Sequence, residues 1–229
     1  MKDLIAIIPV SSFNDSKTRL SPFLSETERV ELLKMMLKDI AEVIENEVEE
    51  IVLVSKDYHV KDFAKELSIN FVKEKKHENN FLNNAISDAV NEVKINYPKK
   101  DILILPSDIP LLKREHVATL KSMDKDLIIS PSKGGGTNLL CFNEQYDFET
   151  RFGPMSYFEH LNKANQLGMS INIIESFYLS LDINTPEDLG ELLLHGTGTN
   201  SYDYLISLNI VVESSHGKER LNVQRKNER

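Results

Sequence analysis

The sequence predicts an α/β fold with a mostly parallel central sheet and helices on both faces. Short apolar runs alternate with amphipathic helical patterns along most of the chain, as repeated strand–helix units do. Several of these runs are apolar throughout, which is typical of strands buried on both faces. The chain has 229 residues and no long Gly-, Ser- or Pro-rich linker. We therefore expect one domain over residues 1–208, followed by a C-terminal hairpin or tail over 209–229.

The first half of the chain supplies four of the expected strands. Ser25 and Glu28 form a capping-box pattern before an amphipathic helix whose apolar stripe runs to Ile44. The helices that follow carry similar stripes. The expected strands are 4–10, 51–55, 69–72 and 101–106, and the later helices are 60–67, 82–95 and 114–123.

The second half is less regular. Strands are expected at 127–131, 138–142 and 176–181. A helix between the last two is expected to be capped by Ser156 with Glu159 and to end at Gly168. Thr185 and Pro186 predict the start of a further helix that runs to about residue 195. In the tail, 210–213 and 221–224 are expected to pair as a hairpin across His216-Gly217, as an edge addition or a dimer contact.

Composition excludes several classes of function. A formal net charge of −9 argues against nucleic-acid binding, which needs clustered Lys and Arg. No apolar stretch approaches the ~20 residues that span a bilayer, and no signal-peptide pattern is visible, so we expect no membrane partner and a cytoplasmic protein. The single cysteine, Cys141, excludes an internal disulfide and a CxxC metal site. The six histidines lack ligand spacing, and no G-x-S-x-G or HExxH motif is present.

Two carboxylates follow predicted strands. Asp108 comes just after the apolar strand 101–106, and Asp182 ends the run 176–181. In open α/β sheets, ligands bind at the carboxyl ends of the strands. Asp108 is therefore a candidate to hold a hard cation such as Mg²⁺ against a substrate phosphate, and Asp182 is a second candidate. Alternatively, each residue only begins a loop or a helix-entry turn, and spacing alone does not show that they converge.

Cations and glycines in the loops suggest anion binding. Lys17 and Arg19 lie two residues apart in the loop after the first strand, where a point charge and a bidentate fork can reach one polyphosphate. Three glycines before Thr137 allow backbone N–H groups to approach an anion, and the helix beginning near Ser156 offers a second anion site. Two such sites suggest a phosphorylated substrate in addition to a nucleotide. The alternatives are solvated cations, a flexible hairpin turn and an ordinary capped helix.

Six segments stand in order between Ile5 and about Gly198, and they are PVSSFNDSKTRLSP, LPSDIPLL, SKGGGTN, RFGPMS, LDINTPEDL and LLHGTG. Together they resemble one family, the 2-phospho-L-lactate guanylyltransferases. The resemblance implies a nucleotidyltransferase with a Rossmann-like, glycosyltransferase-A-like fold. It implies transfer of GMP from GTP to 2-phospho-L-lactate or phosphoenolpyruvate, with release of pyrophosphate, in coenzyme F-420 biosynthesis. It also implies Mg²⁺ as the cofactor and a homodimer as the assembly.

The same resemblance implies roles for individual residues. The catalytic set is Lys17, Arg19 and Asp108. The nucleotide is bordered by Pro9, Val10, Lys17, Arg19, Asn83, Pro106 and Asp108. Thr137, Gly153 and Ser156 bind the acceptor, and Asp108, Asp182 and Asn184 hold Mg²⁺.

This chain departs from the family pattern at two places. The family often has a second aspartate where this chain has Asn184, whose carbonyl oxygen can still bind a cation but adds no charge. A lysine common in the first loop is replaced by Ser11 or Ser12, so Lys17 and Arg19 are expected to carry more of the phosphate charge.

Other functions remain open at this stage. One alternative is a nucleotidyltransferase for a different acceptor, such as a sugar phosphate or molybdopterin, although the glycine loop and the helix start near Ser156 suit a compact anion better. A further alternative is a nucleotide-binding regulator that has lost catalysis, with Asn184 as the mark of that loss.

For the transferase, no general base is required, because the acceptor phosphate has a second pKa near ~6 and is already a nucleophile at neutral pH.

Overall fold

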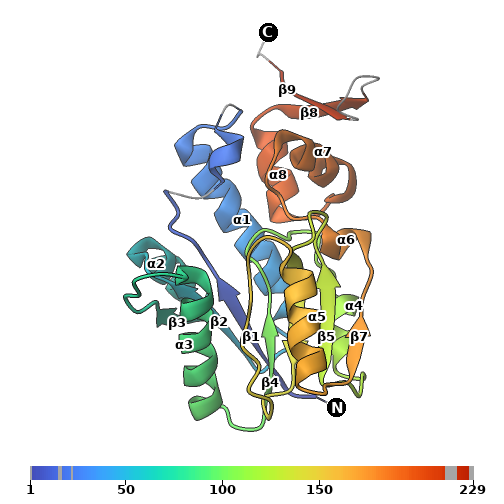
Figure 1. The fold of residues 1–229 in the computed structure, drawn as a ribbon. Coiled ribbons are helices and arrows are strands. Elements are labelled where there is room, and N and C mark those ends of the chain that lie inside the picture. The colour runs from blue at the N-terminus through green and yellow to red at the C-terminus, as the bar shows by residue number, and fades with distance from the viewer. Residues whose placement is uncertain (1, 15–16, 22, 215–220, 227–229) are drawn as a thin grey trace.

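A computed structural model describes residues 2–14, 17–21, 23–214 and 221–226. Within these ranges, seven strands form one sheet in the order β3-β2-β1-β4-β6-β5-β7 (Figure 1). The strands are β1 Leu4–Pro9, β2 Glu50–Ser55, β3 Asn70–Lys73, β4 Asp101–Ile104, β5 Leu127–Pro131, β6 Thr137–Phe142 and β7 Ile171–Ile173. Strand β6 runs antiparallel to β4 and β5, and the other neighbours are parallel. The predicted mostly parallel sheet is confirmed.

Helices cover both faces of the sheet. They are α1 Glu26–Ile44, α2 Tyr58–Glu66, α3 Phe81–Asn96, α4 Arg114–Leu120, α5 Ser156–Gln166, α6 Phe177–Ser180, α7 Pro186–His195 and α8 Asn200–Ser207. Helices α3 and α5 lie on the near face in Figure 1. Successive side chains of β1 point to opposite faces of the sheet. Ile5 and Ile7 pack in the core with α3 and α5. Leu4, Ala6 and Ile8 pack in the core with α1, α2 and α4. No helix in the described ranges is long and apolar enough to cross a membrane.

Two predicted helix starts are confirmed. The Ser25 hydroxyl accepts from the Glu28 N–H, and the Glu28 carboxylate accepts from the Ser25 N–H, which closes a capping box on α1. Thr185 and Asp188 form the same box at α7, with Pro186 as the first helical residue. These bonds satisfy N–H groups that a helix start otherwise leaves without partners.

Three predictions of local structure are wrong or incomplete. Residues 176–181 were expected as a strand, but α6 forms there, and the Ser180 N–H donates to the Ser176 carbonyl in a helical turn. The edge strand β7 and helix α8 were not expected at all. Ser156 is not the cap of α5, because Met155 takes that position in the left-handed region, with φ of 57°, and Ser156 is buried.

The C-terminal hairpin packs against the rest of the molecule. Strands β8 Ile210–Ser214 and β9 Leu221–Arg225 pair antiparallel, as expected, and the turn at His216-Gly217 lies outside the described residues. Gly190 of α7 lets the hairpin approach closely, since a Cβ there would lie 3.0 Å from a Leu221 methyl carbon. Arg225 adds an ion pair of 2.8 Å with Glu28 of α1.

The directions of the strands place the loops that carry the predicted site residues at one edge of the sheet. Strands β1, β2, β4 and β5 are parallel, so their carboxyl ends lie on the same side. Because β6 is antiparallel to β4 and β5, its first residue, Thr137, lies at that edge as well. This edge therefore holds the loop of Lys17, the loop of Asp108 and the glycines before Thr137.

Candidate active site

Four polar side chains from three separate segments meet at this edge. The Lys17 ammonium donates to the Asp108 carboxylate and to the Asn184 side-chain oxygen, the latter at 3.1 Å. The Asn184 amide in turn donates to the Asp182 carboxylate. The Lys17 side chain is only 7% exposed, so its charge is directed inward. The structure therefore brings together the predicted residues Lys17, Asp108, Asp182 and Asn184.

Backbone contacts hold these segments in place. The Ile183 N–H donates to the Asp108 carbonyl at 2.9 Å, which ties the loop after β4 to the loop before α7. Ile183 itself is fully buried, so the Asp182 loop is anchored in the core. Lys17 has a left-handed backbone, with φ of 53°, and precedes a short 3₁₀ turn, Thr18–Leu20, whose Leu20 is buried.

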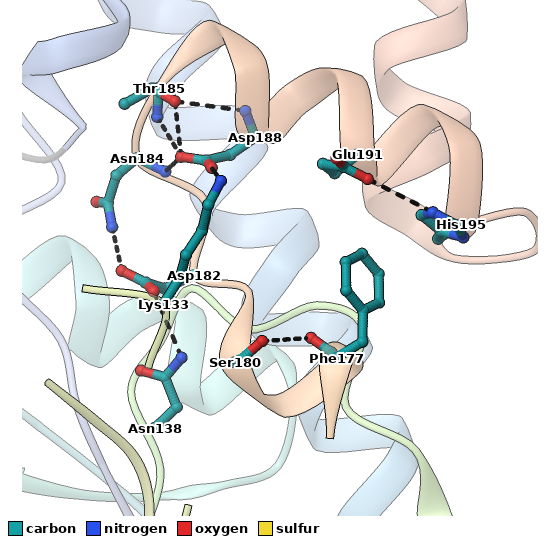
Figure 2. Close-up of polar contacts among 10 residues, drawn as sticks. All are labelled: Lys133, Asn138, Phe177, Ser180, Asp182, Asn184, Thr185, Asp188, Glu191 and His195. Atoms are coloured by element: carbon teal, nitrogen blue, oxygen red, sulfur yellow. Dashed lines mark hydrogen bonds and ion pairs between the residues drawn. The ribbon is translucent and has the colours of Figure 1, made fainter. Parts of the chain in front are cut away.

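The surroundings of Asp182 destabilise the charged form of its carboxylate. Burial raises its pKa above the ordinary value, and the negative charge of Asp108 raises it further. Asn138 partly offsets this by donating to Asp182 at 3.4 Å while it also donates to the Leu179 carbonyl at 2.8 Å. Figure 2 shows Asp182 between the amides of Asn138 and Asn184. A cation near both carboxylates would relieve their repulsion.

The start of α7 positions Asn184. Asp188 accepts from the Asn184 N–H at 3.0 Å and from the Thr185 N–H and hydroxyl, both at 2.8 Å (Figure 2). Lys133, from the loop before the glycines, lies 3.8 Å from the other Asp188 oxygen. The capping box thus fixes the backbone that carries Asn184, and Lys133 adds a positive charge that the sequence analysis did not single out.

A cavity of about 410 Å³ lies next to this cluster. Four residues predicted to border the nucleotide line it, and these are Pro9, Val10, Pro106 and Asp108. Apolar side chains of α3, Phe81 and Leu82, form another wall, with Lys56 and Glu74 at the strand ends. A cavity of about 480 Å³ between α1 and the start of β2 is lined by several glutamates and lies at the opposite sheet edge, so it does not suit a nucleotide.

Two other predicted nucleotide residues lie in different surroundings. Asn83 is buried, donates to the Phe152 carbonyl at 2.8 Å and accepts from the Phe152 N–H at 2.7 Å. It therefore holds Phe152, which lines the cavity. Arg19 is exposed in the 3₁₀ turn beside Lys17. Direct contacts of Asn83 and Arg19 with a nucleotide stay predictions.

The three residues predicted to bind the acceptor lie together. Ser156 Oγ is 3.2 Å from Thr137 Oγ1, and the Ser156 N–H donates to the Gly153 carbonyl at 3.2 Å. The Tyr157 N–H donates to the Gly135 carbonyl, so protein carbonyls already occupy the first N–H groups of α5. The first N–H groups of α5 therefore have protein partners, and binding of an anion by the nearly buried Thr137 and Ser156 hydroxyls stays a prediction. Sequence reasoning set aside His160, which lies one turn after Ser156 and contacts Thr137.

Comparison with solved structures identifies the fold. A putative nucleotide-diphospho-sugar transferase from Desulfovibrio desulfuricans superposes with a TM-score of 0.76 at 16% identity, covering 90% of this chain and 95% of that one. The 4-diphosphocytidyl-2C-methyl-D-erythritol synthase of Anaerococcus prevotii gives 0.56 at 14% identity, covering 90% and 99%. The fold is that of the nucleotidyltransferases.

Comparison with related sequences identifies the family of the chain. Residues 4–226 match the family described as "Guanylyl transferase CofC like", and the chain belongs to that family. The 2-phospho-L-lactate guanylyltransferase of Methanosphaera stadtmanae is 56% identical over the full length of both chains. That of Methanocaldococcus jannaschii is 46% identical over 92% of this chain and 91% of its own.

Proposed function

We propose that this protein transfers GMP from GTP to 2-phospho-L-lactate and releases pyrophosphate, as a cytoplasmic homodimer. Family membership supports the reaction, and the convergence of Lys17, Asp108, Asp182 and Asn184 beside the 410 Å³ cavity is the observation that carries it. Phosphoenolpyruvate differs from phospholactate by two hydrogens and is the alternative acceptor. The relatives named above support the assignment of phospholactate.

The donor set fits Mg²⁺. Asp108, Asp182 and the Asn184 carbonyl oxygen would hold the ion, because Mg²⁺ prefers oxygen ligands and needs only one or two carboxylates besides substrate phosphates and water. Among the described residues, no group of three or more His, Cys, Asp or Glu side chains could hold a metal, and the proposed set combines two carboxylates with an amide oxygen. When bound, the ion supplies positive charge for the phosphates of GTP and for the leaving pyrophosphate.

The residues of the chain account for the remaining steps. An oxygen of the acceptor phosphate attacks the α-phosphorus, the new P–O bond forms, and the bond to the bridging oxygen of pyrophosphate breaks. No proton has to be removed from the nucleophile at neutral pH. Lys17, now paired with Asp108, is placed to move onto the nucleotide phosphates and to neutralise charge as it develops. Thr137, Gly153 and Ser156 would hold the acceptor in line.

Pyrophosphate release from purified protein with GTP and Mg²⁺ tests the proposal. We expect release with 2-phospho-L-lactate, slower release with phosphoenolpyruvate and none without an acceptor. Mass spectrometry should find the guanylylated acceptor in the same mixture. Tight GTP binding with no release under either acceptor would contradict the proposal and favour the regulator that has lost catalysis.

A further inference from the structure

His160 links two parts of the predicted acceptor site. Its ring is fully buried on α5, and Nε2 lies 2.9 Å from the Arg151 main-chain nitrogen, while Nδ1 lies 2.9 Å from Thr137 Oγ1. A main-chain N–H can only donate, so Nε2 must accept and carries no hydrogen. The hydrogen of the neutral ring is therefore on Nδ1, and it is donated to Thr137 Oγ1.

The surroundings of the ring keep it neutral. Phe148 and Phe152 pack around it, with ring centroids 6.0 and 4.9 Å away. Burial lowers the pKa of His160 to about 4, so the neutral form dominates at neutral pH. A charged ring would also direct a second N–H at the Arg151 N–H, which the geometry does not accommodate.

This tautomer determines how many O–H hydrogens the Thr137–Ser156 pair can donate to a ligand. The hydroxyls of Thr137 and Ser156 lie 3.2 Å apart, and together they own two hydrogens, one of which is used in the bond between them. Because Nδ1 donates into this pair, it takes neither hydrogen. The pair therefore keeps one O–H hydrogen that it can donate to a ligand. The other tautomer would accept that hydrogen and leave none.

We infer that His160 is a positioning residue that directs one hydroxyl hydrogen of the Thr137–Ser156 pair toward the phosphate or carboxylate of the acceptor. This inference rests on the proposed function, which places the acceptor at these hydroxyls. It also explains the choice of ligand, because a site whose available hydrogen is a donor favours an anion over a neutral hydroxyl compound. The same ring holds Arg151, two residues before Gly153, and so fixes the third acceptor residue.

A double-mutant cycle tests this role. Acceptor binding is measured by calorimetry with 2-phospho-L-lactate, in the presence of Mg²⁺ and a GTP analogue with a carbon bridge between the α- and β-phosphorus, which prevents turnover. In His160→Gln, the amide oxygen can still accept from the Arg151 N–H, but the donor to Thr137 is lost. We expect acceptor binding to weaken roughly 10-fold in this variant, while binding of the analogue changes less than about 2-fold.

Thr137→Val and the double variant complete the cycle. If His160 acts through Thr137, the double variant binds the acceptor no more than about 2-fold more weakly than Thr137→Val alone. His116→Gln is the matched control, since its Nδ1 also accepts a main-chain N–H, from Lys113 at 3.1 Å, and its Nε2 faces the Ser176 hydroxyl. It should bind both ligands as the wild type does.

The outcomes separate this inference from the proposed function. Fully additive losses, or unchanged acceptor binding in His160→Gln, overturn the positioning role even when the wild type releases pyrophosphate. Equal weakening of acceptor and analogue also overturns it, because that result indicates a general structural role. A wild type that neither binds 2-phospho-L-lactate nor releases pyrophosphate overturns both.

Discussion

Single residues set the charge of the candidate site. Lys17 brings one formal positive charge, and Asp108 and Asp182 bring two formal negative charges, so the formal charge of the three side chains is −1. Asn184 adds oxygen and amide groups without a third negative charge. This balance favours a cation and a phosphate entering together, because each compensates the charge that the other brings.

Replacement of Asp108 tests that balance. Asp108→Asn keeps the size of the side chain but removes the charge that pairs with Lys17 and that would hold Mg²⁺. We expect turnover to fall at least ~10²-fold with the fold intact, as judged by circular dichroism and thermal unfolding. Asp124→Asn, at an exposed position, is the control and should retain full turnover. Normal turnover in Asp108→Asn would rule out its proposed role as a metal ligand.

Sequence patterns predicted these residues one at a time but not their assembly. Asp108 was identifiable because it follows a buried strand, and Lys17 because it follows β1. Their convergence with Asp182 depends on the Ile183–Asp108 backbone bond, which joins residues far apart in the chain and leaves no local signal. His160 was missed because a buried histidine on an amphipathic helix has the same period as a core residue.

At the scale of elements, prediction succeeded where the pattern was long. Helices α1 and α3 carry apolar stripes over several turns and were found close to their observed limits. The apolar run at 176–181 is too short for its period to distinguish helix from strand, and it forms α6. Strand β7 has only three residues, Ile-Asn-Ile, so it is too short for its alternation to be recognised as a strand.

Helix α8 is held by a contact that no local pattern shows. The buried Asp39 of α1 accepts from the main-chain N–H groups of Asn200 and Ser201, at 2.6 and 3.0 Å, and from both of their side chains. This carboxylate binds N–H groups at the start of α8, which have no partner within the helix itself. Helix α8 in turn packs against α1 and leads into β8.

Removal of this carboxylate should loosen the C-terminal part of the protein. Asp39→Ala leaves two N–H groups and the fully buried Ser201 hydroxyl without their acceptor. We expect the free energy of unfolding to fall by about 2–4 kcal/mol, measured by urea denaturation. Glu42→Ala is the matched control, because the exposed Glu42 contacts the Asn200 side chain, at 2.9 Å, and pairs with Lys38 on its own helix, at 3.8 Å. A similar loss in both variants would show that burial of the Asp39 carboxylate is not the cause.

At the scale of the whole molecule, the candidate site lies where the two packed faces meet. Asp182 and Asn184 flank Ile183, which belongs to the core that contains α1, α4 and α7, whereas His160 packs with Phe148 and Phe152 on the opposite side. The residues proposed to bind the acceptor and those proposed to hold the metal are thus anchored in different cores and lie at the same sheet edge. Stability of either core therefore affects the site.

This arrangement predicts a loss of stability in acid. The pKa of His160 in the folded protein is about 4, below the ordinary 6.5, so between these values the unfolded chain binds a proton that the folded chain does not. Stability is then fully present above the unfolded pKa and falls as the pH drops toward 4. Between about pH 7.5 and about pH 5, this histidine should lower the free energy of unfolding by about 2 kcal/mol.

The same His160→Gln variant isolates this effect. Its free energy of unfolding at neutral pH includes the loss of the bond to Thr137, so the informative quantity is the difference between the two pH values. Because glutamine does not titrate, we expect the variant to lose about 2 kcal/mol less than the wild type over that pH range in urea denaturation. Equal losses in the two proteins would mean that His160 becomes protonated in the folded state near its ordinary pKa. The neutral tautomer that orders Thr137 and Ser156 would then not persist in mild acid, and acceptor binding should weaken there.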